Sequence, residues 1–227
     1  MTFSPEQFGE FRFGVKEYQL IHIPGKLTPR MYYDFSVADI ENGFDDRSRV
    51  NGLSNAKRAL HFQVELISSA FGIEKLPYKE RRNFSNKLQF CRKCGVTGER
   101  VLNKLNRIRN LVEHEYHIPT KDELEDFIDI VELFLSATDR FLYSFPVGLE
   151  LEAFSTENKE SLPAITRVEM PPNKGIVRLP IWPGEEGLGN LNSIKLVELH
   201  GIYSIELHVY DGDTYFEWVR LIVDNSL

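Results

Sequence analysis

Apolar residues recur at intervals of three or four through the middle of the chain, the spacing that places side chains on one face of an α-helix. The pattern predicts four helices between about residues 51 and 145. They are one that starts after a Ser54/Asn55 cap, a basic one over residues 78 to about 94, one through residues 101–112 and one that starts at Thr120. Helices joined by such short connections pack as an up-and-down bundle.

The start of the fourth predicted helix has a clear local signature. Thr120 and Glu123 stand at the first and fourth positions of a capping box, in which each side chain bonds the backbone N–H of the other residue. Pro119 directly precedes this box and cannot continue the helix before it. The third helix therefore has to end by Pro119, and the fourth begins immediately after it.

Apolar and polar residues alternate near both termini, which is typical of strands with one buried face. Phe11, Phe13 and Val15 alternate with polar residues near the N-terminus, and Asp211-Gly212 is a hairpin dipeptide near the other end. The N-terminal strands could complete the C-terminal sheet, because chain termini often lie close together. The other runs that we predict as strands are Tyr18–Ile23, Ile165–Met170, Gly175–Trp182, Ile194–Leu199, Tyr203–Tyr210 and Thr214–Val223.

These patterns predict an α+β protein in three regions. An extended N-terminal segment covers residues 1–50, a four-helix bundle covers residues 51–145, and an antiparallel β module covers residues 146–227. The 227 residues are enough for one large domain or two small ones. The chain has no apolar run long enough to span a membrane and no leader-like N-terminus, so we expect a cytoplasmic protein without membrane partners.

Charge is distributed unevenly along the chain, whose net charge is −7. Residues 75–109 carry eleven lysines and arginines against two glutamates, a net charge of +9, whereas residues 146–227 carry a net charge of −7. The basic segment indicates attraction of phosphate, although it could also be no more than the solvated face of helices. The residues from this segment that we expect to bind RNA are Arg81, Arg82, Lys104 and Arg107.

The basic segment leads into the sequence Arg109-Asn110-x-x-x-His114-x-Tyr116. Within about two helical turns it offers a fixed positive charge, an amide, a group that titrates near neutrality and a phenol. These groups can cleave RNA without a metal: His114 takes the proton of the 2′-OH, Arg109 stabilises the charge on the phosphate, and Asn110 orients His114. An alternative is a surface ion pair between Arg109 and Glu113, beside a tyrosine that only packs on the core.

The spacing R-N-x-x-x-H-x-Y resembles the signature of HEPN domains, whose active members are toxin-type ribonucleases with a four-helix plan. The resemblance covers about residues 51–145 and implies an endoribonuclease toxin of a toxin–antitoxin or defence system, which leaves a 2′,3′-cyclic phosphate. It also implies that Tyr116 accepts nucleotidyl groups from a cognate antitoxin of the nucleotidyltransferase type. The residues alone leave two other roles open for Tyr116, namely stacking a base and anchoring the chain in the core.

Helical geometry favours a site built by two chains. On one helix Asn110 and His114 share a face, but Arg109 and His114 diverge by roughly 140°. Either the helix ends near His114, which frees that side chain to turn, or two copies face each other and build one groove. The HEPN resemblance implies the second arrangement, a two-fold homodimer.

Cys91 and Cys94 form a C-x-x-C pair, which is half of a zinc site. No second pair follows, so a metal would need His61, His114 or His117, or a partner subunit. We expect no cofactor and interpret the pair mainly as two reduced thiols at a helix end.

Two other classes of function stay open. The bundle could be a non-catalytic adaptor that binds nucleic acid or protein, with the β module performing the recognition. The chain could also be a purely structural dimer.

Overall fold

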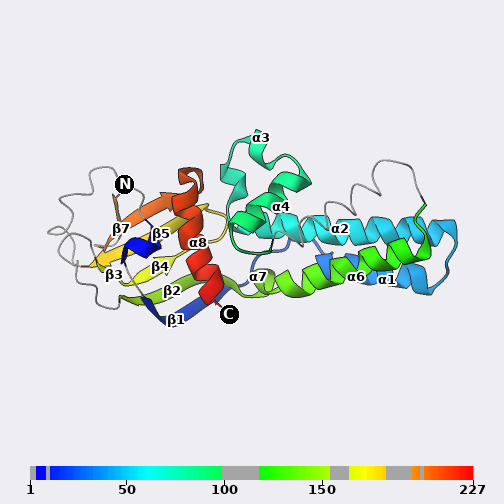
Figure 1. Ribbon diagram of the computed structural model, residues 1–227, viewed down its shortest axis with the longest axis horizontal. Helices are drawn as coiled ribbons and strands as arrows, with labels where there is room; N and C mark the ends of the chain where they lie inside the picture. The colour runs from blue at the N-terminus through cyan, green and yellow to red at the C-terminus, as the bar shows by residue number, and fades with distance from the viewer. Residues whose placement is uncertain are drawn as a thin grey trace.

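The structure of the protein, a computed structural model, describes residues 4–8, 11–98, 118–153, 164–182, 196–199 and 202–226. Helices gather in one half of the molecule, and the other half is an antiparallel sheet that carries a helix on one face (Figure 1). The predicted α+β class is therefore confirmed. Within the described ranges, no helix combines the length and the apolar composition that a membrane crossing requires.

Three helices form the long helical half: α1 (Pro29–Glu41), α2 (Asp46–Ala70) and α6 (Lys121–Thr138). Figure 1 shows them side by side, with α1 running opposite to α2. Their apolar faces turn toward one another, as the helical spacing predicts. The fully buried side chains of α2 and α6 include Ala56, Ala59, Val64, Ile67, Leu124, Phe127, Val131 and Leu135.

Side-chain caps start these helices. Thr28 Oγ1 accepts a hydrogen bond from the backbone N–H of Met31 at 3.2 Å, and Asp45 Oδ1 accepts one from Ser48 at 2.7 Å. The predicted Thr120–Glu123 capping box is present in both directions. Each cap satisfies a backbone donor that the first helical turn leaves without a partner, so the helices begin at defined residues.

The predicted start of the first long helix is wrong, because α2 begins at Asp46, two turns before the expected Ser54/Asn55 cap. Inside the helix Ser54 Oγ donates to the carbonyl of Val50 at 2.8 Å. Asn55 Nδ2 donates to Asp39 Oδ2 of α1, also at 2.8 Å. Polar side chains that bond a preceding carbonyl or a neighbouring helix do not end a helix, so the composition of this stretch was misleading.

The segment 1–50 is not extended throughout, since α1 and the first turn of α2 lie within it. Tyr33, Val37 and Ile40 are partly buried and pack against the core. Their spacing of four and three residues places them on one helical face. Aromatic and β-branched residues gave this stretch a strand-like composition, which packing against α2 overrides.

Two short helices replace the single basic helix predicted over residues 78–94. They are α3 (Tyr78–Arg81) and α4 (Phe84–Lys93). Asn83 separates them, and its side chain accepts a hydrogen bond from the backbone of Asn86 at 2.8 Å and so caps α4. The helix predicted through residues 101–112 lies outside the described residues.

In the part of the chain that the structure describes, seven strands form the sheet, with the order β1-β2-β4-β5-β7-β6 and with β3 beside β5. All pairs are antiparallel. Because β1 pairs with β2, the N-terminal strand does complete the C-terminal sheet. The strands are β1 (Phe11–Gln19), β2 (Phe145–Ala153), β3 (Ala164–Ile165), β4 (Arg167–Glu169), β5 (Ile176–Trp182), β6 (Leu196–Leu199) and β7 (Ile202–His208).

Two details of the strand prediction differ from the structure near this pair. Only the first two residues of the predicted strand Tyr18–Ile23 lie in a strand, because β1 ends at Gln19. The backbone N–H of Ile21 donates to the carbonyl of Leu142 at 2.8 Å instead. The strand β2 was not predicted. It follows directly on α7 (Arg140–Tyr143), so the apolar residues at its start were taken as the end of a helix.

The last predicted strand, Thr214–Val223, is wrong, because the chain forms the helix α8 (Asp213–Asn225) there. The predicted Asp211-Gly212 hairpin is wrong for the same reason. A 3₁₀ turn over Val209–Asp211, η4, precedes α8, and Gly212 between them has a φ of +68°. Glycine adopts a positive φ equally well before a helix and in a hairpin turn. The Asp211-Gly212 dipeptide therefore does not distinguish a hairpin from the start of a helix. The buried residues of α8 recur at helical spacing: Tyr215, Phe216, Trp218, Val219, Ile222 and Val223.

The end of α2 joins the two halves of the molecule. The hydroxyl of Tyr215 in α8 donates to the carbonyl of Phe71 at 2.7 Å. At the next residue, Gly72, an added Cβ would lie only 2.2 Å from the Cα of Gly175, just before β5. One connected cluster of buried side chains runs through both halves. The sheet is therefore packed directly against the helical half, and α8 covers its apolar face (Figure 1).

Candidate functional site

The predicted catalytic residues Arg109, Asn110 and His114 lie outside the described residues, and so does Tyr116. Lys104 and Arg107, which we expect to bind RNA, also fall in that gap of the chain. Their mutual geometry stays a prediction. The described residues on either side of the gap, and the other predicted residues, can be located.

The chain on the two sides of this gap lies at opposite ends of α2. After the gap, the carbonyl of Pro119 accepts a hydrogen bond at 2.9 Å from Nη1 of Arg49, near the start of α2. Before the gap, α4 packs along the last turns of α2, where Lys87 Nζ lies 2.8 Å from Glu65 Oε1. Arg49 and Glu65 are separated by roughly 24 Å along the helix, at about 1.5 Å per residue.

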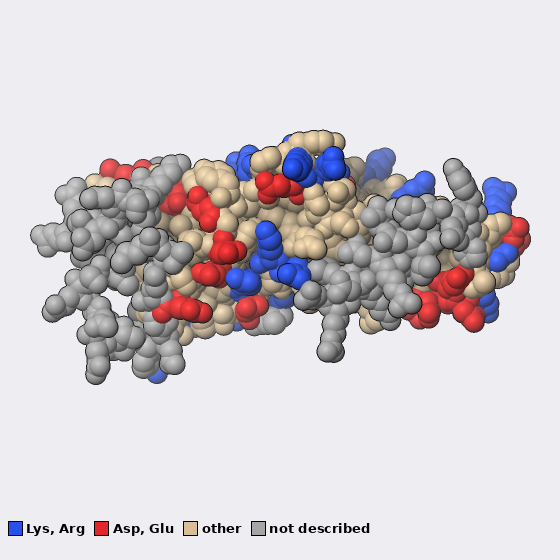
Figure 2. All heavy atoms as spheres, turned by 45° about the horizontal axis from the view of Figure 1, so that its top comes forward, with Lys and Arg blue, Asp and Glu red and all other residues tan. Residues whose placement is uncertain are grey.

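Arg81 and Arg82, the two predicted RNA-binding residues within the described ranges, have different surroundings. Nη1 of Arg81 lies 2.6 Å from Glu74 Oε2, and its Nε donates to the carbonyl of Leu76 at 3.2 Å. Arg81 is thus held against its own chain. Arg82 is exposed at the end of α3. Figure 2 shows Lys and Arg side chains gathered where α3 and α4 project from the body of the molecule.

Cys91 and Cys94 are both fully buried, with no exposed surface. Burial raises the pKa of Cys91 to about 12, and burial beside Cys91 raises the pKa of Cys94 well above its ordinary value. A thiol that stays protonated at neutral pH is a poor nucleophile. No group of three or more metal-ligating side chains occurs among the described residues.

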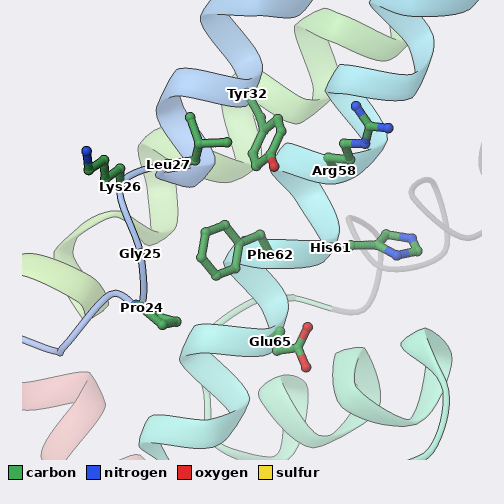
Figure 3. Close-up of a pocket in the computed structure, with 9 residues that line it drawn as sticks. All are labelled: Pro24, Gly25, Lys26, Leu27, Tyr32, Arg58, His61, Phe62 and Glu65. Carbon is green, nitrogen blue, oxygen red and sulfur yellow. The ribbon is translucent and has the colours of Figure 1, made fainter.

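A cavity of about 540 Å³ lies between the loop at Pro24–Leu27, α1 and α2. Figure 3 shows Phe62 pointing toward this loop and Tyr32 descending from α1 on the same side. His61 and Arg58 extend from α2 in another direction, away from the loop. The cavity thus has an aromatic side next to the loop and a polar side along α2.

The polar side of the cavity is connected to neighbouring residues. Arg58 Nη1 donates to Asn55 Oδ1 at 3.1 Å, and the ring of His61 stacks on Phe84 with centroids 4.3 Å apart. Glu65 is engaged by Lys87, as described above. These groups offer a cation, an imidazole and a carboxylate in a row, and the residues that line the cavity include no serine, threonine or cysteine. Their chemistry suits binding of a polar ligand better than covalent catalysis.

Sequence reasoning treated His61 only as a possible metal ligand and gave Arg58 no role. A usable signal was present, because Arg58, His61 and Glu65 follow one another at intervals of three and four. That spacing places polar groups on a single helical face. The contribution of Tyr32 could not be read from the sequence, since it comes from the helix α1 in a segment that was predicted to be extended.

Comparisons of the chain with protein-family models, with curated proteins and with solved structures found no significant match. What the chain does must therefore be inferred from its own residues and contacts.

Proposed function

We propose that this protein is a metal-independent endoribonuclease of the HEPN type, a toxin of a toxin–antitoxin or defence system. The observation that carries the proposal is the sequence Arg109-Asn110-x-x-x-His114-x-Tyr116 at the end of a basic segment. It supplies a general base, a phosphate-binding cation and an orienting amide within two helical turns. RNA is the expected substrate because it carries its own nucleophile, the 2′-OH, which DNA lacks.

In the proposed reaction His114, neutral at cellular pH, removes the proton from the 2′-OH. The 2′-oxygen attacks the adjacent phosphorus, the bond to the 5′-oxygen breaks, and that oxygen leaves as a hydroxyl after taking a proton from water. Arg109 holds the charge that grows on the phosphate oxygens, and Asn110 orients His114 or binds one of those oxygens. The products are a 2′,3′-cyclic phosphate and a 5′-hydroxyl.

Described residues on both sides of the motif support a HEPN-like four-helix plan. The chain before the motif packs at the end of α2, and the chain after it returns to the start of α2. A third helix that runs alongside α2 would have to start near one end of α2 and finish near the other, and the described chain on its two sides lies at those two ends. The capping box at Thr120 also starts α6 immediately after the motif segment. The helical half also contains α1, which was not among the four predicted helices and which packs on both α2 and α6.

The proposed enzyme acts as a two-fold homodimer. Since Arg109 and His114 diverge by roughly 140° on one helix, two facing copies bring an arginine and a histidine together across a groove. Light scattering of the purified protein at micromolar concentration should give twice the mass of the chain. A monomer at that concentration would count against a shared groove.

Tyr116 is the proposed site of control by a cognate antitoxin. A nucleotidyl group on its phenol would bring negative charge beside His114 and repel the phosphates of RNA. Intact-mass measurement after co-expression with a neighbouring nucleotidyltransferase should show added nucleotide mass on the wild type and none on Tyr116→Phe. Suppression of toxicity with nucleotide on another residue, or on none, would reject this assignment.

The central experiment expresses the wild type, His114→Ala, Arg109→Ala and the matched control His117→Ala side by side. His117 is a histidine of the same segment but outside the motif. We expect loss of the general base in His114→Ala, and loss of the phosphate-binding cation in Arg109→Ala, each to lower the RNase rate by at least ~100-fold. His117→Ala should keep the wild-type rate, and EDTA should leave that rate unchanged. Intact rates in both motif variants, or strict metal dependence, would overturn the mechanism.

A second candidate function, a non-catalytic RNA-binding adaptor, is favoured by the exposed basic residues of α3 and α4 (Figure 2). The same experiment separates the two. An adaptor binds RNA in a salt-dependent way but leaves it intact in all variants, including the wild type.

A further inference from the structure

A groove of about 710 Å³ runs between the basic α3–α4 segment and the C-terminal η4–α8 segment. One wall comes from the helical half and the other from the half that contains the sheet (Figure 1). The groove is distinct from the cavity on α2 and shares no lining residue with it. The sequence left the role of the C-terminal half open, and this groove is a surface to which that half contributes.

The floor of the groove is apolar and rigid. Phe90 of α4 and Phe216 of α8 are almost fully buried, and their rings meet edge to face with centroids 5.6 Å apart. Val209 of η4 is buried beside them. These contacts fix the two walls relative to one another, so the groove is formed before any ligand binds.

The rim of the groove is polar and carries two exposed lysines, Lys79 and Lys93. Nζ of Lys93 lies 5.3 Å from the ring centroid of Phe216, and this contact holds the ammonium above the floor. One acidic residue, Glu80, also lines the wall, so the lining keeps a net positive charge. Amide groups of Asn86 and Gln89 complete the α4 side.

Tyr210 is the aromatic group of the opposite wall and is 65% exposed. Its ring stacks on His208, with centroids 4.8 Å apart and an angle of 7° between the planes. The backbone around it is held as well, because the N–H of His208 donates to Asp211 Oδ2 at 2.5 Å. An exposed tyrosine whose ring is fixed by a neighbour is a prepared platform for another flat group.

We propose that this groove binds single-stranded RNA, with one unpaired base stacked on Tyr210 and backbone phosphates held by Lys79 and Lys93. The inference rests on the proposed function for the identity of the polymer. A basic groove with an exposed aromatic ring is the combination by which proteins hold single strands, because every base has a face that can stack. The C-terminal half would thus supply base contacts, while the chemistry stays in the helical half.

The test measures fluorescence anisotropy of a short labelled oligouridine with full-length protein that carries His114→Ala, so that cleavage cannot interfere. Tyr210→Ala should weaken binding by roughly 5- to 140-fold, the effect of losing one base–aromatic stack. Tyr210→Phe keeps the ring and should bind like the parent. Tyr143→Ala, which removes an exposed tyrosine of α7 outside the groove, serves as the matched control and should also bind like the parent.

Two further arms define the ligand. Lys79→Gln and Lys93→Gln should each lower the slope of log affinity against log salt by about 0.7, the value for one phosphate contact on a single strand. Duplex RNA of the same length should be insensitive to Tyr210→Ala, because its bases are not free to stack on a side chain. Equal loss for duplex and single strand, or competition by polyglutamate as strong as competition by RNA, would overturn the proposal.

The outcome is separable from that of the proposed function. Cleavage by the wild type with equal oligouridine affinity in Tyr210→Ala and its parent would reject the groove and leave the ribonuclease standing. Absence of cleavage with a selective affinity loss in Tyr210→Ala would reject the ribonuclease and leave the groove as an RNA-binding site. Thermal unfolding of Tyr210→Ala should match that of the parent, which assigns an affinity loss to the ring and not to misfolding.

Discussion

The helical half and the sheet half of the molecule place their polar groups in different ways. In the helical half, buried polar side chains link one helix to the next: Nε2 of Gln63 in α2 donates to Thr138 Oγ1 and to Asp139 Oδ1, each at 3.0 Å. In the sheet half, charged side chains gather on the face opposite the apolar one. Arg178 of β5 pairs there with Glu206 of β7, its direct cross-strand neighbour, at 2.7 Å.

This difference follows from the geometry of the elements. A helix face that is buried against other helices has no access to water, so a polar group on that face is satisfied by a neighbouring helix, as Nε2 of Gln63 is. A strand alternates between two faces, so Arg178 and Glu206 can share one face while their neighbours Val177 and Ile205 are fully buried on the other. In the helical half, buried polar groups are therefore placed by individual contacts between helices. In the sheet half, polar groups are placed by the alternation of side chains between the two faces of each strand.

The strongest test of the comparison concerns the junction between the halves. Gly72→Ala should destabilise the protein by at least about 3 kcal/mol, because its φ of +90° disfavours alanine and the new Cβ would meet the backbone of Gly175. Urea unfolding followed by circular dichroism measures the change. Gly25→Ala, with a φ of +83° and open space around it, is the control and should cost about 1 kcal/mol. Equal effects would mean that the halves are not in contact at Gly72.

The next test concerns the charged face of the sheet. Arg178→Met should cost about 2 kcal/mol, because it leaves the side chain of Glu206, only 9% exposed, without its guanidinium partner. Arg167→Met is the matched change on the same face. Its partners Glu17 and Glu169 are 45% and 36% exposed and can turn to water, so we expect a cost of about 0.5 kcal/mol. Thermal unfolding of the two variants should rank in this order, and the reverse order would contradict it.

In the helical half, Arg30 of α1 bonds Glu132 at 2.5 Å and Asp139 at 2.7 Å. Arg30→Met should cost about 1 kcal/mol at neutral pH, since these groups are about one third exposed and water screens them. Burial alone would raise the pKa of Glu132, but hydrogen bonds from Arg30 and Ser136 outweigh burial and lower it. A carboxyl with a lowered pKa stabilises the folded state above its ordinary value of 4.5, and that stabilisation is lost as pH falls through the folded value.

The difference in unfolding free energy between wild type and Arg30→Met should therefore shrink as the pH is lowered below about 4.5. Urea titrations at a series of pH values measure this difference. A gap that stays constant down to strongly acidic pH would show that the contribution of Arg30 is packing of its stem and not its charge.

The smallest expected effect concerns the two arginines at the end of α3, Arg81 and Arg82. Arg82→Glu should lower RNA affinity and flatten its salt dependence without affecting folding, because Arg82 is exposed. Arg81→Glu should lower the melting temperature as well, since it places a second carboxylate against Glu74. Anisotropy and thermal unfolding of the two variants together make the distinction. Identical melting temperatures would contradict the anchored role that the structure gives Arg81.

How much of the fold the sequence predicts depends on how local each signal is. The capping box at Thr120 was predicted correctly because both of its partners lie within four residues. The helix α8 was predicted as a strand because its apolar residues, Tyr215 to Val223, fit a short strand as well as a helix face until the surface that covers them is known. The helix α1 was missed for a similar reason, since its packing partners α2 and α6 lie far along the chain.

The candidate sites divide in the same way. The motif from Arg109 to Tyr116 is a matter of spacing alone, and the basic character of residues 75–109 is a matter of composition, so the sequence by itself determined both, together with the α+β class. Only the tertiary structure decided that Tyr210, Lys79 and Lys93 line one groove. It also decided that Arg81 is bound to its own chain through Glu74. The physical reason is that contacts between residues distant in sequence depend on how whole elements pack, and no local pattern encodes that packing.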